Sequence, residues 1–264
     1  MIEAYYNFKK SPFPKDIQPS DIFISPAVKE LQHRLHYIKE KRGIMLLTGV
    51  PGCGKTAHLR AFVAKLNENL YKSFYLPLST VNILDFYRQL CSKLGGASFY
   101  RKTQLFSSIQ HTIRDYVENA KKIPIIIFDE AHFLINENFY ELQIITNFHM
   151  DSVDPAVFIL SGQPHIRDRL LRPIHQSFNQ RIHLKFHLSA LTKEESNAYI
   201  EHQLHLAGAC ECIFNNNALS ALFQVSAGVP RIINALAIKT LEIGAREKKD
   251  CLSEEEVYRA SKEL

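Results

Sequence analysis

Five short apolar runs alternate with amphipathic stretches of helical spacing between residues 43 and 190. Such alternation predicts a parallel sheet with helices on both faces. The predicted strands span residues 43–49, 73–79, 123–129, 156–161 and 181–188. After these strands the apolar positions follow only the helical period, which predicts a small helical domain. The pattern divides the chain into an N-terminal segment with one helix at 1–42, an α/β domain at 43–190 and a helical domain at 191–264.

Two of the predicted strands have the character of sheet edges. SFYLPLS contains Pro77, which cannot donate a hydrogen bond to a central ladder. RIHLKFHL alternates apolar residues with His183, Lys185 and His187, so one of its sides is expected to meet water. The continuous run IIIF at 125–128 predicts an interior strand.

Helix starts in the C-terminal part are marked by two capping boxes. Thr192 is followed three residues later by Glu195, and Ser253 by Glu256. In such a box each side chain hydrogen-bonds the other residue's backbone N–H. We therefore expect helices to begin after Thr192 and after Ser253.

The composition is that of an ordinary globular protein, with 264 residues, 46% hydrophobic and 22% charged. No apolar run approaches the roughly 20 residues of a membrane helix, and the N-terminus lacks the apolar stretch of a signal peptide. We therefore expect a cytoplasmic protein without a membrane partner. The five cysteines are scattered and odd in number, which predicts reduced thiols. The net charge of +5 permits a polyanionic partner without requiring one.

The first chemical motif is GVPGCGKT, directly after the first predicted strand. Gly49, Gly54, Lys55 and Thr56 fill the specified positions of G-x-x-x-x-G-K-[ST], a loop whose backbone N–H groups wrap nucleotide phosphates. The apolar positions that follow share one face of a helix, as the motif requires: Leu59, Phe62, Val63 and Leu66. The other loop positions counted with the nucleotide site are Pro51, Gly52, Cys53 and Ala57. The motif predicts nucleotide binding.

The second motif is IIIFDEAHFL, in which Asp129 and Glu130 end the predicted interior strand. A carboxylate at this place, beside a phosphate-binding loop, can hold the Mg²⁺ that Thr56 also ligates. A neighbouring Glu can orient and deprotonate an attacking water. The pair therefore extends the prediction from nucleotide binding to hydrolysis.

Two arginines complete the candidate chemistry. Arg181, in SFNQRI, precedes the last edge strand, where it can reach a neighbouring subunit's γ-phosphate better than its own. Arg231, in SAGVPRIINALA, starts a helix just after Gly228 and Pro230, a turn that could hold its guanidinium over the nucleotide. Taken alone, a surface ion pair would explain either arginine as well.

The motifs GVPGCGKT, IIIFDEAHFL, FILSGQP, QRI and GVPRIINALA, in this order, resemble the AAA+ ATPases of the ExeA, TniB and TnsC group. These are ATPases of type II secretion and of DNA transposition, and the N-terminal YYNFKKSPFP extends the similarity to nearly the whole chain. The resemblance implies a five-stranded parallel P-loop sheet with a small C-terminal helical lid. It also implies ATP and Mg²⁺ as cofactors, hydrolysis to ADP and phosphate, and a homo-oligomeric ring or helical filament.

The resemblance also implies a role for each matching residue. Lys55 would contact the phosphates, Thr56 and Asp129 would bind Mg²⁺, Glu130 would activate water, Gln163 would be the first sensor, Arg181 the arginine finger and Arg231 the second sensor. The first sensor is commonly Asn, so Ser161 remains an alternative to Gln163. Arg172 competes with Arg181 as the finger.

The resemblance favours the transposition branch of the group. The secretion ATPases continue into a membrane span and a cell-wall-binding domain, whereas this chain ends at Leu264. Transposition ATPases oligomerise with ATP on duplex DNA and present it to a transposase, and hydrolysis is expected to dismantle the oligomer. The alternatives are an ExeA-like secretion-assembly ATPase, a chaperone-like or defence ATPase, and a nucleotide-gated scaffold with little turnover.

A candidate DNA contact lies in the segment SFYRKTQLF. Arg101, Lys102 and Thr103 place basic and hydroxyl groups at a helix start, which suits phosphate contact, although a solvated helix cap explains them equally well. Lys121 and Lys122 follow the other end of this helix and are expected to complement its dipole. Nothing resembles base readout, so DNA binding would be largely independent of sequence.

Overall fold

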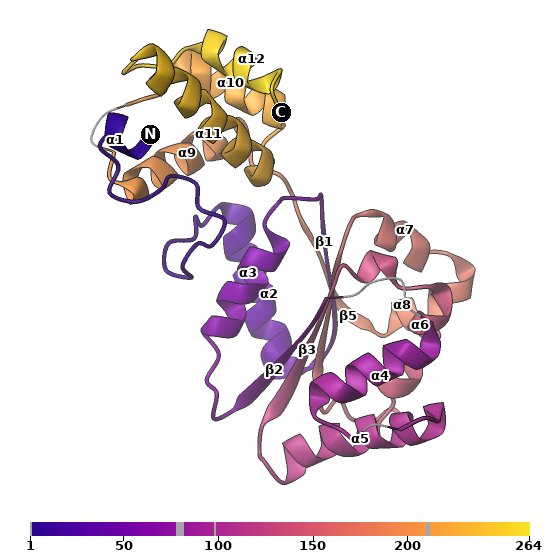
Figure 1. Cartoon of the computed structure of the whole chain (residues 1–264). Coiled ribbons are helices and arrows are strands. Elements are labelled where there is room, and N and C mark those ends of the chain that lie inside the picture. Colours follow the sequence, from indigo (N-terminus) through magenta and orange to yellow (C-terminus); the bar gives the residue numbers. More distant parts are fainter. Residues whose placement is uncertain (1, 78–81, 98, 210–211) are drawn as a thin grey trace. The chain divides into compact units, whose positions relative to one another are not determined.

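The computed structural model describes residues 2–77, 82–97, 99–209 and 212–264 (Figure 1). The chain forms two compact units. The sheet unit consists of residues 28–49 and 59–188, and the helical unit consists of residues 1–27, 50–58 and 189–264. The phosphate-binding loop thus packs with the helical unit, although it follows directly on a strand of the sheet.

The sheet unit contains five parallel strands in the order β2-β3-β4-β1-β5. They are β1 (Gly43–Gly49), β2 (Tyr71–Pro77), β3 (Ile123–Asp129), β4 (Val157–Gly162) and β5 (Ile182–Leu188). The order confirms the predicted edge strands and the interior position of β3. The predicted continuation of the second strand to residues 78 and 79 lies outside the described residues.

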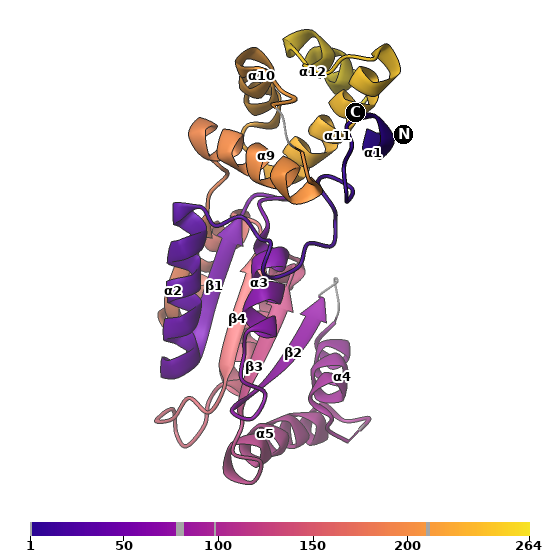
Figure 2. The same ribbon diagram turned by 90° about the vertical axis from the view of Figure 1, so that its left-hand side faces the viewer.

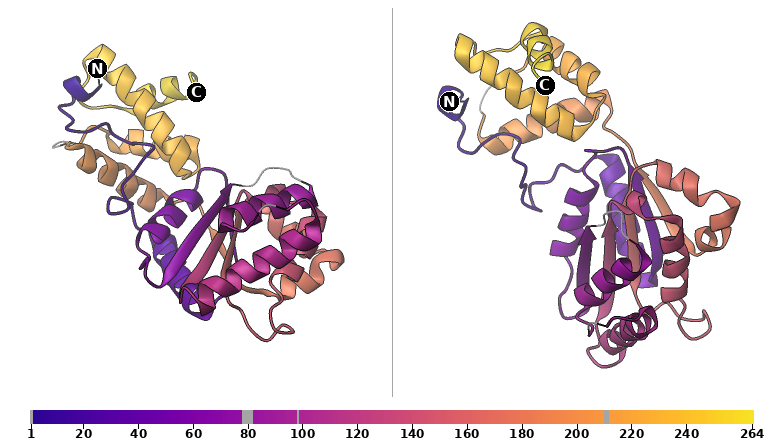
Figure 3. Two further views of the ribbon diagram at one scale, coloured as in Figure 1. Left: turned by 60° about the horizontal axis from the view of Figure 1, so that its bottom comes forward. Right: turned by 45° about the vertical axis from the view of Figure 1, so that its right-hand side comes forward.

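Helices cover both faces of the sheet. Its helices are α2 (Pro26–Lys41), α3 (Lys55–Ala64), α4 (Ile83–Leu94), α5 (Lys102–Glu118), α6 (Asn136–Ile145), α7 (His165–Leu170) and α8 (Gln176–Gln180), with the 3-10 turns η1 (Ala131–Phe133) and η2 (Pro173–His175). α2 and α3 lie on one face, and α4 and α5 lie on the other (Figure 2). In the left view of Figure 3, α4 and α5 cross in front of the strands.

Strand alternation builds the core of the sheet unit. Ile126 and Phe128 of β3 point to the face covered by α4 and α5, and both are fully buried. Phe86 of α4 stacks on Phe128 with ring centroids 5.8 Å apart. Burial of each such side chain contributes about 1.5–3 kcal/mol. The core holds β3 rigid up to Asp129 at its carboxyl end.

The helical unit joins the N-terminal segment to the C-terminal helices. It contains α1 (Ile2–Tyr5), α9 (Lys193–Ala207), α10 (Asn216–Ser226), α11 (Pro230–Glu247) and α12 (Glu254–Ser261). Phe8 and Phe13 are buried in the core of this unit, and the backbone N–H of Lys9 donates to Ala207 O at 2.7 Å. The N-terminal segment is therefore part of the helical unit's core.

Both predicted capping boxes are present in the helical unit. The Thr192 and Glu195 side chains exchange hydrogen bonds with each other's backbone at the start of α9, and Ser253 and Glu256 do the same at α12. Burial alone would raise the pKa of the Glu256 carboxyl, but hydrogen bonds from Lys249 and Ser253 hold it at about 2. Glu256 is thus a buried anion whose charge stabilises this helix start.

Candidate nucleotide site

The phosphate-binding loop follows β1 and leads directly into α3. Gly52 and Gly54 have φ angles of 84° and 97°, in the left-handed region that favours glycine. α3 begins at Lys55, so the loop meets a helix N-terminus, where backbone N–H groups and the helix dipole favour an anion. The Lys55 ammonium donates to Val50 O at 3.1 Å and is therefore folded back over the loop.

Arg231 lies against this loop within the helical unit. Its backbone N–H donates to Gly52 O at 3.2 Å. A Cβ added to Gly52 would lie 2.7 Å from the Arg231 Cβ, so only glycine permits this approach. The predicted turn before Arg231 depends on a second glycine: Gly228 has a φ of 73°, and a Cβ there would meet Leu191 O at 2.0 Å. The structure thus brings together the loop and the arginine expected to act as second sensor.

Asp129 ends β3 with its carboxylate held by three donors. Ser161 Oγ donates to Oδ1 at 2.8 Å, and the Glu130 backbone N–H donates to the same oxygen at 3.0 Å. Tyr75 Oη donates to Oδ2 at 2.9 Å from the neighbouring edge strand. Burial, together with this bond to Asp129, raises the pKa of the Tyr75 hydroxyl. Tyr75 was not among the predicted site residues, whereas Ser161 was an alternative sensor.

Glu130, the predicted base, has a φ of 55° and a ψ of 34°, a left-handed conformation that is uncommon for a residue with a side chain. Its Oε2 lies 3.3 Å from Nδ1 of the buried His132. The other ring nitrogen of His132 lies 3.1 Å from the Gln163 amide nitrogen. The structure therefore gathers the predicted base and the predicted first sensor around one histidine.

The donor chemistry fits Mg²⁺. Thr56 supplies a hydroxyl and Asp129 a carboxylate, both hard oxygen ligands. Within the described part of the chain, no group of three or more His, Cys, Asp or Glu side chains could hold a metal ion. Mg²⁺ in phosphate sites commonly uses one or two protein oxygens together with phosphates and waters, which agrees with this limited donor set.

Arg169 anchors the segment that follows Glu130, a role that sequence reasoning missed. Its guanidinium donates to His132 O at 2.9 Å, to Leu134 O at 2.7 Å and to Asn136 Oδ1 at 3.1 Å. It also lies 5.3 Å from the centre of the Phe139 ring. α7 follows β4, the strand that carries Ser161. Arg169 therefore ties α7 to the turn that follows β3.

The two candidate fingers differ in their surroundings. The Arg181 guanidinium forms an ion pair and hydrogen bond with Asp151 of the same chain. Arg172 is exposed and precedes η2. Both arginines stay candidates for a contact with a neighbouring subunit.

The three residues of the predicted DNA contact differ in their surroundings. Arg101 and Thr103 are exposed at the start of α5. The Lys102 ammonium, in contrast, lies 2.5 Å from the buried carboxylate of Glu141, which also accepts a hydrogen bond from Tyr87 Oη at 2.7 Å. Lys102 therefore neutralises a buried anion, and Arg101 is the stronger candidate for a phosphate contact.

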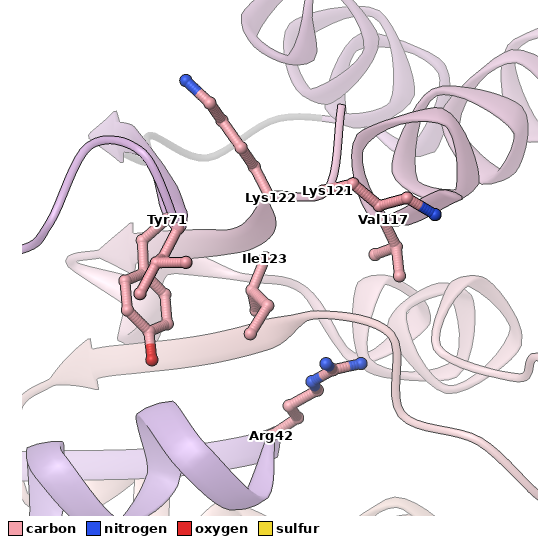
Figure 4. A pocket seen from close by; sticks show the side chains of 7 residues that line it. Arg42, Tyr71, Val117, Lys121, Lys122 and Ile123 are labelled. Atoms are coloured by element: carbon pink, nitrogen blue, oxygen red, sulfur yellow. The ribbon is translucent and has the colours of Figure 1, made fainter. Parts of the chain in front are cut away.

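A separate pocket of about 210 Å³ lies at the amino ends of β2 and β3 (Figure 4). It is lined by Arg42, Leu70, Tyr71, Val117, Lys121, Lys122 and Ile123. Arg42 follows the C-terminus of α2, and Lys121 follows that of α5, where cations complement helix dipoles. Because α5 itself ends at Glu118, the electrostatic role expected of Lys121 and Lys122 stays a prediction.

The fold and the site together define a P-loop nucleotide-binding protein of the AAA type. The model of the family described as AAA domain matches residues 38–170. The chain belongs to this family. The match covers the phosphate-binding loop, Asp129, Glu130 and Gln163, and so agrees with the broader part of the expected resemblance.

A curated relative is General secretion pathway protein A of Aeromonas hydrophila, 27% identical over 245 residues. The match covers 91% of this chain and 44% of the relative, so the chain spans less than half of that protein's length. Among the described helices, none combines the length and apolar character that a membrane crossing requires.

Solved structures support the same fold at low identity. The Aeropyrum pernix ORC2 protein in ADPNP and ADP complexes has a TM-score of 0.69 and 19% identity, covering 97% of this chain and 72% of that chain. Drosophila ORC bound to DNA has a TM-score of 0.71 and 17% identity, with coverages of 98% and 64%. The Thermotoga maritima RuvB Holliday junction branch migration motor has a TM-score of 0.53 and 18% identity, with coverages of 95% and 72%.

Proposed function

We propose that the protein is an ATPase that hydrolyses ATP to ADP and phosphate. The observation that carries the proposal is the carboxylate of Asp129, oriented by donors from Tyr75, Ser161 and the Glu130 backbone at the end of β3. A carboxylate fixed in this way, in a chain with a G-K-T loop, suits a metal-nucleotide complex better than a structural role. Mg²⁺, held by Thr56 and Asp129, would neutralise charge on the phosphates.

In this proposal each of the remaining site residues has a separate role in ATP binding or hydrolysis. Lys55 binds the β- and γ-phosphates, and the loop N–H groups orient them. Glu130 accepts a proton from the attacking water as the water oxygen bonds to the γ-phosphorus and the bond to ADP breaks. Gln163 or Ser161 acts as first sensor, and Arg231 contacts the nucleotide as second sensor.

Two variants separate binding from hydrolysis. Lys55→Ala removes the cation that faces the phosphates, so ATP binding should be lost in a calorimetric titration. Glu130→Gln keeps the shape of the side chain but not its basicity, so it should bind ATP and turn it over at least about 100-fold more slowly. Wild-type turnover by Glu130→Gln would show that Glu130 is not the base.

We further propose that ATP binding builds a homo-oligomer on duplex DNA, that this oligomer recruits or activates a transposase, and that hydrolysis dismantles it. The charge composition of the sheet unit supports the proposal of an anionic partner, because this unit contains 20 Lys and Arg against 13 Asp and Glu. The helical unit has 12 against 14, so the basic surplus of the chain belongs to the sheet unit. A largely sequence-independent contact with phosphates would use such a surplus.

The salt dependence of DNA binding tests the proposed contact. Arg101→Ala should flatten the slope of log affinity against log salt by about one unit per subunit, equally on unrelated duplexes. Lys102→Ala is a less clean variant, because it leaves the buried Glu141 carboxylate without its cation. An unchanged slope for Arg101→Ala would remove this residue from the DNA interface.

A second candidate function is that of a secretion-assembly ATPase, which is favoured by the match to General secretion pathway protein A over 91% of this chain. Electron microscopy with a non-hydrolysable ATP analogue, with and without duplex DNA, distinguishes the two. Rings or filaments that form around DNA would support the transposition proposal. Assembly that depends on nucleotide and ignores DNA would favour the secretion candidate or a nucleotide-gated scaffold.

A further inference from the structure

We propose that His132 is a positioning residue for hydrolysis: it holds the carboxylate of Glu130 on one ring nitrogen and is itself held by Gln163 on the other. The inference rests on the proposed ATPase function and on Glu130 as its base. The histidine of the FDEAHFL segment, to which the nucleotide-binding motifs give no role, thereby gains one.

The three side chains are joined by two contacts. His132 Nδ1 lies 3.3 Å from Glu130 Oε2, and His132 Nε2 lies 3.1 Å from the Gln163 amide nitrogen. Glu130 follows β3 and Gln163 follows β4, two strands that are neighbours in the sheet. His132 therefore connects the carboxyl ends of adjacent strands through its ring.

The contacts with Gln163 and Glu130 agree with one tautomer of the His132 ring. The amide nitrogen of Gln163 can only donate, so His132 Nε2 accepts that hydrogen bond. In the neutral imidazole the proton then resides on Nδ1, the nitrogen that faces the Glu130 carboxylate. At 3.3 Å from Oε2, this N–H faces the exposed Glu130 carboxylate closely enough that a small movement of that side chain would form the hydrogen bond, and the neutral ring adds no positive charge to the site.

Neighbouring segments fix the ring in place. His132 is 6% exposed, and its backbone oxygen accepts a hydrogen bond from Arg169 at 2.9 Å. The His165 ring meets it edge-on with centroids 5.1 Å apart. A Cβ added to Gly162 would lie 3.2 Å from the His132 backbone nitrogen, so the end of β4 also approaches closely.

The base needs this support, because its side chain is 48% exposed and its backbone is in the left-handed region. An exposed carboxylate can adopt several rotamers, and only some of them face an attacking water. Loss of the His132 contact should therefore slow the chemical step and leave ATP affinity nearly unchanged. We expect a fall in kcat of about tenfold or more, since small misplacements of a reacting group can cost up to about 100-fold.

Three substitutions at this position test the two contacts separately. His132→Phe keeps a ring and removes both nitrogens, so kcat should fall about tenfold or more, with KM for ATP within about twofold of wild type. His132→Asn places an amide near the position of Nδ1 and should recover much of the lost kcat. His132→Gln places its amide near the position of Nε2, where it faces Gln163, and should recover less.

His165→Phe is the matched control, because it keeps an exposed ring that can meet His132 edge-on and removes only the His165 nitrogens. It should keep wild-type turnover. Thermal unfolding of each variant checks the fold, and if His132→Phe does not fold, the comparison of His132→Asn with His132→Gln decides. Equal kcat for these two variants, or wild-type kcat for His132→Phe, would overturn the inference.

The failure of this inference differs from failure of the proposed function. If Glu130→Gln keeps wild-type turnover, the assignment of the base is wrong. If Glu130→Gln is slow while His132→Phe is not, only the role of His132 is wrong. Where both are slow, His132→Phe added to Glu130→Gln should cause no further loss, because the two residues act through the same step. An additive loss would also overturn the role of His132.

Discussion

The sheet unit orients its candidate chemistry through side chains, whereas the helical unit holds the phosphate-binding loop through its backbone. Asp129 accepts hydrogen bonds from the hydroxyls of Ser161 and Tyr75. The loop is instead docked by a bond from the Arg231 backbone N–H to Gly52 O. A side-chain network can lose one donor and keep the others. Backbone docking depends on the absence of a side chain, so one added methyl group can remove it.

The two units also contain different candidate arginines, Arg181 in the sheet unit and Arg231 in the helical unit. We expect the largest loss of ATP turnover from substitution of Arg181. If Arg181 acts on a neighbouring subunit's nucleotide, Arg181→Ala should bind ATP normally and lose about 1,000-fold in turnover, the usual scale of an arginine finger. Mixing it with Lys55→Ala should restore some turnover at mixed interfaces. The control is Asp151→Asn, which removes the ion pair within the chain and should keep activity. Mixtures that stay inactive in every ratio would argue against a contact in trans.

A substitution at Gly52 tests the backbone contact that holds the phosphate-binding loop within the helical unit. Gly52→Ala places a Cβ 2.7 Å from the Arg231 Cβ, so the loop should move away and ATP affinity should fall about 10- to 100-fold. Gly95→Ala is a matched control, because Gly95 has a similar φ of 81° with no atom within 4 Å of an added Cβ. It should cost about 1 kcal/mol of stability from backbone strain and leave ATP affinity unchanged. Equal ATP affinities for the two variants would contradict the proposed docking.

Asp129 in the sheet unit accepts hydrogen bonds from several donors, so we expect the loss of one donor to have a smaller effect on the affinity for Mg²⁺-ATP. Ser161→Ala and Tyr75→Phe each remove one donor to Asp129, so each should lower the apparent affinity for Mg²⁺-ATP by about fivefold to tenfold, the scale of one typical hydrogen bond when the other donors remain. The double variant should lose more than either single one. A titration of ATPase activity with Mg²⁺ at fixed ATP measures the change. Wild-type behaviour of the double variant would mean that these donors do not orient the carboxylate.

The last expected effect is on stability rather than on activity, and it concerns the helical unit at low pH. The folded pKa of Glu256 is about 2, below its unfolded value of about 4.5, so its charge stabilises the fold above that unfolded value. This contribution should disappear as the pH falls from about 4.5 to about 2. Glu256→Gln should lower the free energy of unfolding at pH 7 by about 1–2 kcal/mol, with a smaller difference at pH 3. Urea titrations at both pH values measure it, and a difference that does not depend on pH would contradict the charge argument.

Local sequence patterns predicted the sheet and the helix starts. The buried runs gave the positions of β1, β3 and β4 within about one residue of those observed, because a fully buried parallel strand needs continuous apolar residues. Thr192 and Ser253 marked helix starts because a capping box is complete within four residues. The phosphate-binding loop was equally visible, since its chemistry lies in consecutive residues.

Contacts between distant segments were not visible in the sequence. Tyr75 and Asp129 are 54 residues apart, and Lys102 and Glu141 are 39 apart. No local spacing shows that Tyr75, on an edge strand, would donate to the end of β3. Lys102 was predicted to contact phosphates or to belong to a solvated helix cap, and its buried partner could not be foreseen because it belongs to α6, a different helix. Such pairs depend on strand order and helix packing, which only the folded chain defines.

The two edge strands restrict how copies of the protein can join. β5 exposes His183, Lys185 and His187, and β2 ends at Pro77, which has no N–H to offer another strand. Charged side chains and proline at sheet edges are the usual means by which proteins prevent edge-to-edge pairing. Both edges therefore disfavour backbone hydrogen bonding between the strands of two copies, the kind of pairing found in amyloid. Copies of the protein would then have to meet through side chains and bound ligands.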